Sequence, residues 1–585
     1  MKCLLIFPPQ SMPENPYLST PILKGILNAN GHNTQIMDLN LEFYNYILNP
    51  EYIKTSLNKL FEDYKKNAEE IFNQYDESKG ISEYPTNFQN KYLKYKKIQK
   101  IDKQQAYQKI NEVGNYINII KTGQKEYEKK DIILARVNLW TVLDYVFLPY
   151  FDAKIINERF FYFIRNLNQL KEFLSESKNI FYKFYENIVP EIIKKNPDYI
   201  GLSICAQSQL LPGLTLAMLL KQKTNAHINI GGSYISKIKE TLKTKPEFFE
   251  LFVDSIIYEE GEIPIIKLME HLEGKINIED VPNLLYLKDS EVQMTSKTPT
   301  MPLNDIPIAD FSDLPLNSYY TDEIVLPMLA ERGCYWSKCN FCDICYTGNK
   351  YDFKKPEKVV AEIKELQEKF GFKKVSFVSE AMSPAYLRKF SNEILKTGLK
   401  INFKIYSRIE RDFTEELLSL IKSAGVTEMQ WGFESVNERV LGLMNKTKFT
   451  DKNERLEIIK TAHRIGIENT GFFMFGFPGE TKEEAMETIN FIQENEEYIK
   501  NCLMSKYMIK EHSPIQERHH DFSISEIYDK DELDLFYFSH KTTDGMSFEE
   551  ATELFNTFVN DFYIRGEVPY SNYHDAFLSS TFWGF

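Results

Sequence analysis

The sequence predicts an α/β protein with two parallel-sheet domains, a helical insertion in the first domain and a small module after the second. Two observations support this prediction. Short apolar runs alternate with segments of helical periodicity in 1–45, 197–295 and 321–520 of the 585-residue chain, as in parallel sheets. In addition, four of the seven cysteines fall within twelve positions, on a loop that follows an apolar run.

The first domain is predicted from an interrupted alternation of strands and helices. Apolar runs at 2–9 and 34–38 flank a helical pattern at 21–30. The alternation resumes much later, with strands near 199–204, 227–233 and 254–262 and helices near 210–223 and 264–272. This order predicts one doubly wound, Rossmann-like domain over 1–45 and 197–295. Ligands of such sheets bind at the carboxyl ends of strands, where this chain places Ser203, Gly231, Gly232, Ser233, Gly261 and Glu262.

The insertion, 46–196, is rich in Lys, Glu, Asn and Tyr and is predicted to form several helices. Its most apolar part, 137–149, has the pattern of a buried helix face, although a lid that contacts substrate is the alternative. Pro302, Pro307 and Pro315 then interrupt the chain, which favours a linker over 296–320.

The second domain, 321–520, repeats strand and helix with greater regularity. Strands are expected near 324–329, 374–380, 400–408, 428–435, 469–480 and 503–509. Six strand–helix units predict a partial (β/α)6 barrel, and polar residues end nearly every strand, where barrel enzymes place their chemistry. The remaining 521–585 is predicted to be a small α-rich module with a helix at 548–562 and an aromatic tail at 582–585.

The cysteine loop contains Cys334, Cys339, Cys342 and Cys345. Thiolates are soft ligands that select zinc, Cu(I) or iron–sulfur clusters. A structural zinc site usually needs two close pairs of ligands, yet no second pair lies nearby and no histidine falls between Cys334 and Cys345. The pattern therefore favours an iron–sulfur cluster, with zinc or no metal as the alternatives.

The loop resembles the cluster loop of the radical S-adenosylmethionine (SAM) enzymes. The shared features are a strand, then Arg-Gly-Cys, an aromatic-rich stretch and Cys-x-Phe-Cys, although the first gap holds four residues instead of the commoner three. The resemblance covers roughly 321–515 and implies a [4Fe–4S] cluster on Cys334, Cys339 and Cys342, with SAM on the open iron. Cys345 either replaces one of these ligands or lies near the cluster.

The strand ends of the second domain also resemble the SAM-binding motifs of that family. The Ser-Glu pair after the second strand corresponds to the motif that meets the SAM amino group, and Arg408 corresponds to the polar position of the third strand. The Glu-Ser pair of the fourth strand corresponds to the motif near the ribose and carboxylate, and a Gly-x-Pro-Gly-Glu turn follows the fifth. The resemblance thus implies SAM contacts by Ser379, Glu380, Arg408, Glu434, Ser435, Gly476 and Gly479. The alternative is that Arg408 and Glu434 pair with each other.

The first domain, directly upstream of this loop, resembles the cobalamin-binding domain of B12-dependent radical SAM enzymes. The resemblance implies that the six residues at its strand ends contact cobalamin, and that a bulky side chain at Gly232 would block binding. The motif Asp-x-His-x-x-Gly of other B12 enzymes is absent, and His32 does not fit it. We therefore expect cobalamin without a protein histidine ligand. The alternative is a Rossmann-like domain that only packs on the catalytic one.

Composition limits the partners and the compartment. The net charge is −14 and no long basic stripe occurs, which argues against nucleic acid. The sequence has no run of 18 apolar residues, so we expect no membrane span. Pro8 and Pro9 end the first apolar stretch too early for a signal peptide. We therefore expect a cytoplasmic protein with a small-molecule or peptide substrate and an electron donor such as flavodoxin or ferredoxin.

The family resemblance implies a cobalamin-dependent radical SAM enzyme. Its expected reaction is methylation of an unactivated carbon of a peptide or natural product, through a 5′-deoxyadenosyl radical and methylcobalamin. The alternatives are a radical SAM cyclisation or rearrangement enzyme and, further away, a non-catalytic iron–sulfur or zinc-binding protein. His512 is the candidate catalytic side chain, as a base or substrate contact, unless it is only a turn residue.

Overall fold

The structure of the protein is a computed structural model that describes residues 1–11, 13–76, 79, 84–150, 164–345, 350–446, 450–537 and 539–564. The chain divides into two compact units. The first contains 1–297 and 310–322, and the second contains 298–309 and the chain from Glu323 onward. The predicted aromatic tail, 582–585, lies outside the described residues.

The first unit is built on a seven-stranded sheet in the order β2-β1-β3-β4-β5-β6-β7. Its strands are β1 (Lys2–Phe7), β2 (Asn33–Asp38), β3 (Tyr199–Ser203), β4 (His227–Gly231), β5 (Ser255–Ile257), β6 (Leu284–Lys288) and β7 (Glu291–Met294). The first five strands are parallel, as predicted, whereas β6 and β7 add an antiparallel edge that the apolar pattern did not indicate. The order reverses between β1 and β3, so the topological switch point lies between these strands.

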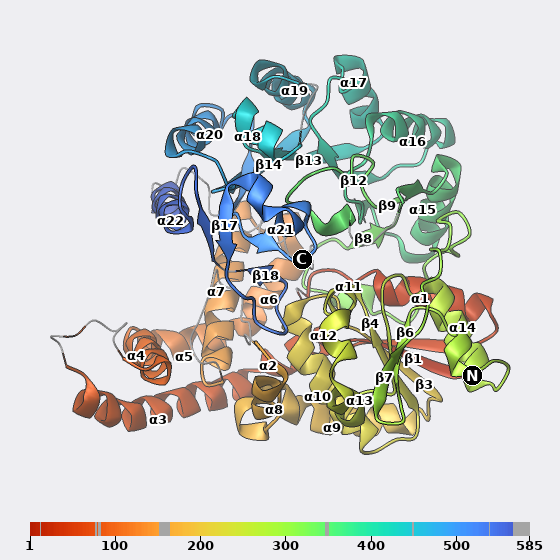
Figure 1. The fold of residues 1–585 in the computed structure, drawn as a ribbon, viewed down its shortest axis with the longest axis vertical. Coiled ribbons are helices and arrows are strands. Elements are labelled where there is room, and N and C mark those ends of the chain that lie inside the picture. Colours follow the sequence, from red (N-terminus) through yellow and green to blue (C-terminus); the bar gives the residue numbers. More distant parts are fainter. Residues whose placement is uncertain are drawn as a thin grey trace. The chain divides into compact units, whose positions relative to one another are not determined.

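Helices cover both faces of this sheet. Crossovers that run in opposite directions from the switch point place their helices on opposite faces, because such connections are right-handed. Accordingly α1 (Ser19–Ala29) packs with α14 (Glu262–Leu272), and α9 (Ile180–Lys194) packs with α10 (Leu210–Lys221) (Figure 1). Three short helices lie between β4 and β5: α11 (Ser233–Lys237), α12 (Lys239–Lys243) and α13 (Pro246–Leu251).

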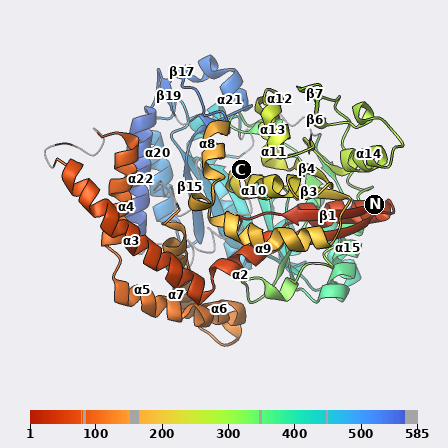
Figure 2. The same ribbon diagram turned by 90° about the horizontal axis from the view of Figure 1, so that it is seen from below.

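The insertion belongs to the same compact unit as the sheet. Its helices are α2 (Leu39–Ile47), α3 (Pro50–Gln74), α4 (Thr86–Gln99), α5 (Lys103–Asn111), α6 (Val113–Thr122), α7 (Lys129–Phe147) and α8 (Leu167–Phe173). α7 packs on α3, α5 and α6 (Figure 2), and Val142 and Val146 on its apolar face are fully buried. The apolar stretch of α7 is therefore helix core in this structure.

The predicted linker is divided between the two units. In the first unit, the buried Lys24 ammonium lies 2.7 Å from Asp313, and Tyr319 donates a hydrogen bond to Asp38. In the second unit, the backbone amide of Leu303 donates to Asp352. The stretch therefore packs as ordered chain on both sides of residue 309 and is not a free connector.

The second unit is built on a six-stranded parallel sheet in the order β15-β14-β13-β12-β11-β8. The strands are β8 (Val325–Met328), β11 (Lys374–Phe377), β12 (Asn402–Arg408), β13 (Val426–Glu434), β14 (Glu468–Phe475) and β15 (Asn501–Lys506). The accompanying helices are α15 (Pro356–Phe370), α16 (Pro384–Thr397), α17 (Glu415–Ser423), α18 (Glu438–Leu443), α19 (Lys452–Ile465) and α20 (Lys482–Glu494). β8 and β15 are the edges, so this is the predicted open barrel, and Pro327 is tolerated because β8 is an edge strand.

The C-terminal module combines the predicted helix with short strands that the sequence analysis did not indicate. Two small antiparallel ribbons form, β16 (Ile509–Lys510) with β18 (Phe536–Tyr537) and β17 (Ile524–Ile527) with β19 (His540–Thr542). Strands of two to four residues are too short to show a period in sequence. The predicted helix is present as α22 (Phe548–Ile564), and it packs against β14 through Phe475 and Phe555. Across the described part of the chain, no helix is long and apolar enough to cross a membrane.

Candidate functional site

The cysteine loop follows β8 and a short ribbon of β9 (Glu331–Arg332) with β10 (Asp352–Phe353). Cys339 is buried, and Cys334 and Cys342 are partly buried. The charge of Cys334 acts on Cys339 and that of Cys339 acts on Cys342, so the three predicted ligands are electrostatic neighbours. The side chain of Cys345 lies outside what the structure describes, and its role therefore stays open.

Hydrogen bonds tie this loop to the turn after α18. The Trp336 indole donates to the Asn445 carbonyl at 2.9 Å, and the Asn340 amide donates to the Met444 carbonyl at 2.9 Å. In return, the Asn445 side chain donates to the Lys338 carbonyl at 2.8 Å. These hydrogen bonds hold the four-residue first gap in a defined conformation.

Arg408 at the end of β12 lies against the aromatic residues of the loop. Its guanidinium carbon is 3.9 Å from the centre of the Trp336 ring, and Nη2 donates to the Lys446 carbonyl at 2.6 Å. The Tyr335 hydroxyl and Arg408 both contact Glu410. Arg408 is therefore part of the support of the cysteine loop, as well as a candidate ligand for SAM.

Lys446 and Glu434 form a buried ion pair beside the same loop. Lys446 Nζ lies 3.1 Å from Glu434 Oε1, and the two side chains are 11% and 15% exposed. Burial lowers the pKa of Lys446, but the charges of Glu434 and Cys339 outweigh it and raise the pKa. Conversely, burial raises the pKa of Cys339 to about 11 against the opposing effects of Lys446 and Arg408. Two cations therefore favour the thiolate form that an iron ligand needs.

Gly432 makes room for this ion pair. A Cβ atom at Gly432 would lie 2.7 Å from Lys446 Nζ and 3.0 Å from Glu434 Oε1. Gly432 is paired in register with Arg408 of β12, which places the ion pair next to the end of that strand. The sequence motif around Glu434 gives no hint of Lys446, because the lysine reaches the site through the tertiary fold.

Two predicted SAM contacts carry polar atoms that fit a ligand. Ser379, two residues after β11, is 2% exposed, and Arg408 is 5% exposed. Among the residues that the structure describes, neither the Ser379 hydroxyl nor Arg408 Nη1 has a hydrogen-bond partner. Buried polar atoms without a partner are costly, so these two fit a polar ligand at the strand ends. Glu380 is partly buried next to Ser379.

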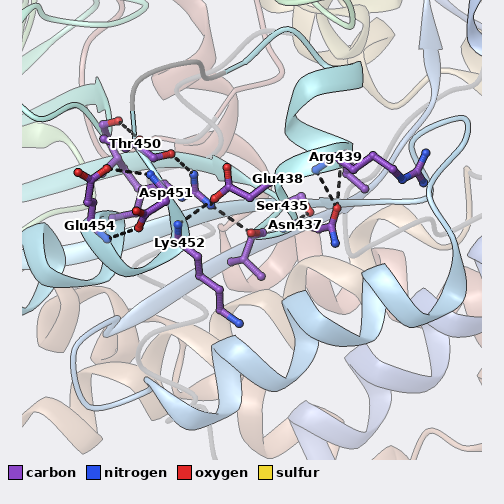
Figure 3. A network of polar contacts seen from close by, with 12 residues as sticks. Ser435, Asn437, Glu438, Arg439, Thr450, Asp451, Lys452 and Glu454 are labelled. Carbon is purple, nitrogen blue, oxygen red and sulfur yellow. Dashed lines mark hydrogen bonds and ion pairs between the residues drawn. The ribbon is translucent and has the colours of Figure 1, made fainter.

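Ser435 has a structural environment. Its hydroxyl lies 3.2 Å from that of Thr488 and accepts a hydrogen bond from the Asn437 amide. Figure 3 shows the polar network that follows, in which Asn437 caps α18 and the Lys452 amide donates to Glu438. These contacts fix both ends of the segment that carries Lys446. Contact of Ser435 with SAM stays a prediction.

The Gly-x-Pro-Gly-Glu turn closes on itself. The Gly476 amide donates to Glu480 at 2.6 Å, and Gly476 and Gly479 have φ of +80° and +86°. Glu480 is fully buried, and burial raises its pKa to about 8. The turn therefore shapes the strand end, and SAM contacts by its glycines stay a prediction. His512 lies in the turn after β16, where its backbone amide donates to Gln516, and its catalytic role also stays a prediction.

The predicted cobalamin residues lie at the carboxyl ends of β3, β4 and β5. The Ser203 hydroxyl lies 2.8 Å from that of Ser19, which joins the two sides of the switch point. The Ser233 hydroxyl donates to the Cys205 carbonyl at 2.9 Å. Gly261 and Glu262 begin α14, and Glu262 is buried. The small residues at this edge fit a wide ligand that approaches the backbone.

Gly232 has a packing role in the structure, and its expected contact with cobalamin stays a prediction. Gly232 has φ of +115°, and a Cβ atom there would lie 2.4 Å from the Ile204 carbonyl oxygen. The glycine is thus required by the packing of β4 against the loop after β3. A leucine at this position would disrupt the domain itself and would not report on cobalamin.

Histidines are confined to the other edge of this sheet. The sequence of this unit contains His32, His227 and His271. His32 directly precedes β2, His227 is the first residue of β4, and His271 lies in the last turn of α14. The charge of His271 acts on His227, which agrees with a common location. No histidine of the unit therefore lies at the edge where ligands of such sheets bind.

Comparison with known proteins agrees with this site. Residues 331–492 match the model of the radical SAM superfamily, which covers the cysteine loop and the strands from β11 to β14. Residues 331–492 therefore carry a radical SAM domain, as the resemblance of the cysteine loop predicted. With it come the expected [4Fe–4S] cluster and SAM, and the buried thiols, cations and partnerless polar atoms described above fit them.

Solved structures share the fold over much of the chain. The cobalamin-dependent SAM radical enzyme OxsB with aqua-cobalamin bound is 16% identical, with a TM-score of 0.52, and the match covers 68% of this chain and 65% of that one. The radical SAM methyltransferase TsrM from Kitasatospora setae, with cobalamin and a [4Fe–4S] cluster bound, is 12% identical with a TM-score of 0.52. That match covers 88% of this chain and 76% of TsrM.

Curated relatives include methyltransferases and a cyclase. An uncharacterized methyltransferase of Pyrococcus horikoshii is 26% identical over 52% of this chain and 66% of its own length. The anaerobic magnesium-protoporphyrin IX monomethyl ester cyclase of Cereibacter sphaeroides is 26% identical over 52% of this chain and 51% of its own. The bacteriochlorophyllide d C-12(1)-methyltransferase of Chlorobaculum tepidum is 28% identical over 33% of this chain and 43% of its own length. The chain thus spans less than two thirds of each of these relatives.

Proposed function

We propose that the protein is a cobalamin-dependent radical SAM enzyme that methylates an unactivated carbon of a peptide or natural-product substrate. The observation that carries this proposal is the combination of two sites in one chain. One is a cysteine loop that hydrogen bonds hold at the strand ends of an open barrel. The other is a parallel sheet of order 2-1-3-4-5, whose strands end at their carboxyl edge in small residues with no histidine among the described ones. Relatives named as methyltransferases support the reaction.

The residues of the second unit have separate tasks in this proposal. Cys334, Cys339 and Cys342 would hold the cluster, while Ser379 and Arg408 would offer their partnerless polar groups to SAM. When bound, cluster and SAM supply the radical chemistry and cobalamin supplies the methyl group. The protein itself binds, orients and excludes water. The electron would come from a one-electron donor such as flavodoxin or ferredoxin.

Reconstitution tests the cofactors directly. Protein purified without oxygen is supplied with iron, sulfide and hydroxocobalamin, and then passed through gel filtration. We expect about four irons per chain and a corrin absorbance that stays with the protein and shows no histidine ligation. Release of 5′-deoxyadenosine from SAM would show an active radical SAM domain. Protein that retains a cluster but no corrin would end the methyltransferase proposal.

A cyclisation or rearrangement enzyme is the second candidate. Its support is the similarity to the magnesium-protoporphyrin monomethyl ester cyclase, which spans the same share of this chain as the first methyltransferase. Isotope-labelled SAM separates the two. Transfer of the labelled methyl group to substrate supports methylation, whereas 5′-deoxyadenosine without labelled product supports rearrangement.

A further inference from the structure

Lys446 stands between a predicted SAM contact and a predicted cluster ligand. Its ammonium lies 3.1 Å from Glu434 and is among the charges that act on Cys339. Nζ also lies 6.0 Å from the centre of the Phe341 ring, inside the cysteine loop. A single cation thus interacts with both predicted cofactor sites.

The fold holds Lys446 in this place. Hydrogen bonds of Met444 and Asn445, the two residues before Lys446, tie the chain to the cysteine loop. The backbone carbonyl of Lys446 accepts a hydrogen bond from Arg408 at 2.6 Å. The space for its ammonium exists because residue 432 has no side chain.

We propose that Lys446 is a positioning residue that couples the occupancy of the SAM site to the reduction potential of the cluster. The inference rests on the proposed cluster and SAM sites. Without SAM, Glu434 neutralises part of the lysine charge. When a polar group of SAM takes the Glu434 carboxylate, the cation is left with Cys339 as the other anionic group that acts on it. A cation beside a cluster favours the reduced state, because net charge sets the potential.

The experiment is a redox titration of the reconstituted cluster, followed by electron paramagnetic resonance, with and without SAM. In Lys446→Met we expect the reduction equilibrium without SAM to fall about tenfold, which is about 59 mV for one electron. Glu434→Gln should shift it in the opposite direction. The change of potential on adding SAM should be smaller in both variants than in the wild type, and Lys446→Arg should restore most of it.

Lys338 provides a matched control. It is adjacent to Cys339 in sequence but exposed to solvent, so water screens its charge. Lys338→Met should therefore move the potential far less than Lys446→Met. Equal shifts in these two variants would show a non-specific charge effect and would overturn the proposal.

Other outcomes remain decisive. Identical potentials in wild type, Lys446→Met and Glu434→Gln would overturn the proposal. If Lys446→Met holds no cluster, Glu434→Gln decides alone, because an unchanged response to SAM in that variant contradicts the coupling. A wild-type protein without cluster or SAM cleavage would refute the proposed function instead, so the two failures are distinguishable.

Discussion

Two glycines at strand ends, Gly232 in the first unit and Gly432 in the second, look alike in sequence and differ in the structure. The position of the absent side chain is blocked by the backbone of Ile204 at Gly232, and by the ion pair of Lys446 and Glu434 at Gly432. The first glycine is therefore needed for the fold, while the second leaves space for charged side chains. A glycine at the carboxyl end of a strand therefore indicates that another group lies close to the backbone, but it does not say whether that group is backbone, side chain or ligand.

The largest effect is expected from the cysteines of the second unit. Cys334→Ala, Cys339→Ala and Cys342→Ala should each reduce SAM cleavage to background, because each removes one cluster ligand. Iron and sulfide content and 5′-deoxyadenosine release measure this. Cys345→Ala should keep the cluster. A cluster that survives in Cys334→Ala and is lost in Cys345→Ala would reverse the ligand assignment.

The next effect concerns the fold of the first unit. Gly232→Ala should lower the free energy of unfolding by about 2–6 kcal/mol, because strain at positive φ and overpacking each cost about 1–3 kcal/mol. Gly261→Ala is the matched control, because its nearest neighbour would be Leu23 at 3.7 Å, an ordinary van der Waals contact. This variant should lower the free energy of unfolding by less than about 1 kcal/mol. Urea denaturation measures both. Equal stability of the two variants would remove the distinction between the glycines.

The longer strands could be predicted from their buried apolar runs, and the helices from apolar residues that recur along a buried face. β7 and the C-terminal ribbons could not, since these strands have two to four residues and few of them are buried. The alternation of strands and helices predicted a doubly wound sheet, but it did not predict that the strand order reverses between β1 and β3. Which strand neighbours which depends on the crossovers and not on any local pattern.

The site was predictable in its motifs and not in its contacts. Arg408 and Glu434 were recognisable from their strand ends, with mutual pairing as the alternative. The structure instead places Arg408 with Trp336 and Glu410, and Glu434 with Lys446. These partners come from the cysteine loop and from the turn after α18, which meet only in three dimensions. Sequence spacing carries no signal for such a meeting.

A moderate effect is expected at Glu434. Glu434→Gln should weaken SAM binding about tenfold, which is about 1.4 kcal/mol, because a neutral amide replaces the charged acceptor while the shape is kept. Isothermal titration on the cluster-loaded protein measures the affinity, and the cluster spectrum should be unchanged. Unchanged affinity would return Glu434 to a structural role as the partner of Lys446.

The smallest effect on SAM binding is expected at Glu480, which differs from Glu434 in being buried without a cation at hydrogen-bond distance in the described structure. Burial raises its pKa from about 4.5 to about 8. Between these values the native state binds more protons than the unfolded chain, so stability falls as the pH rises through this window. Glu480→Gln should remove this slope, at most about 1.4 kcal/mol per pH unit, because the amide stays neutral and still accepts from Gly476. Thermal unfolding from pH 5 to pH 8 measures the slope, and SAM affinity should not change. A slope that persists in the variant would show that it comes from other groups, and a loss of SAM binding equal to that of Glu434→Gln would show that Glu480 faces the ligand.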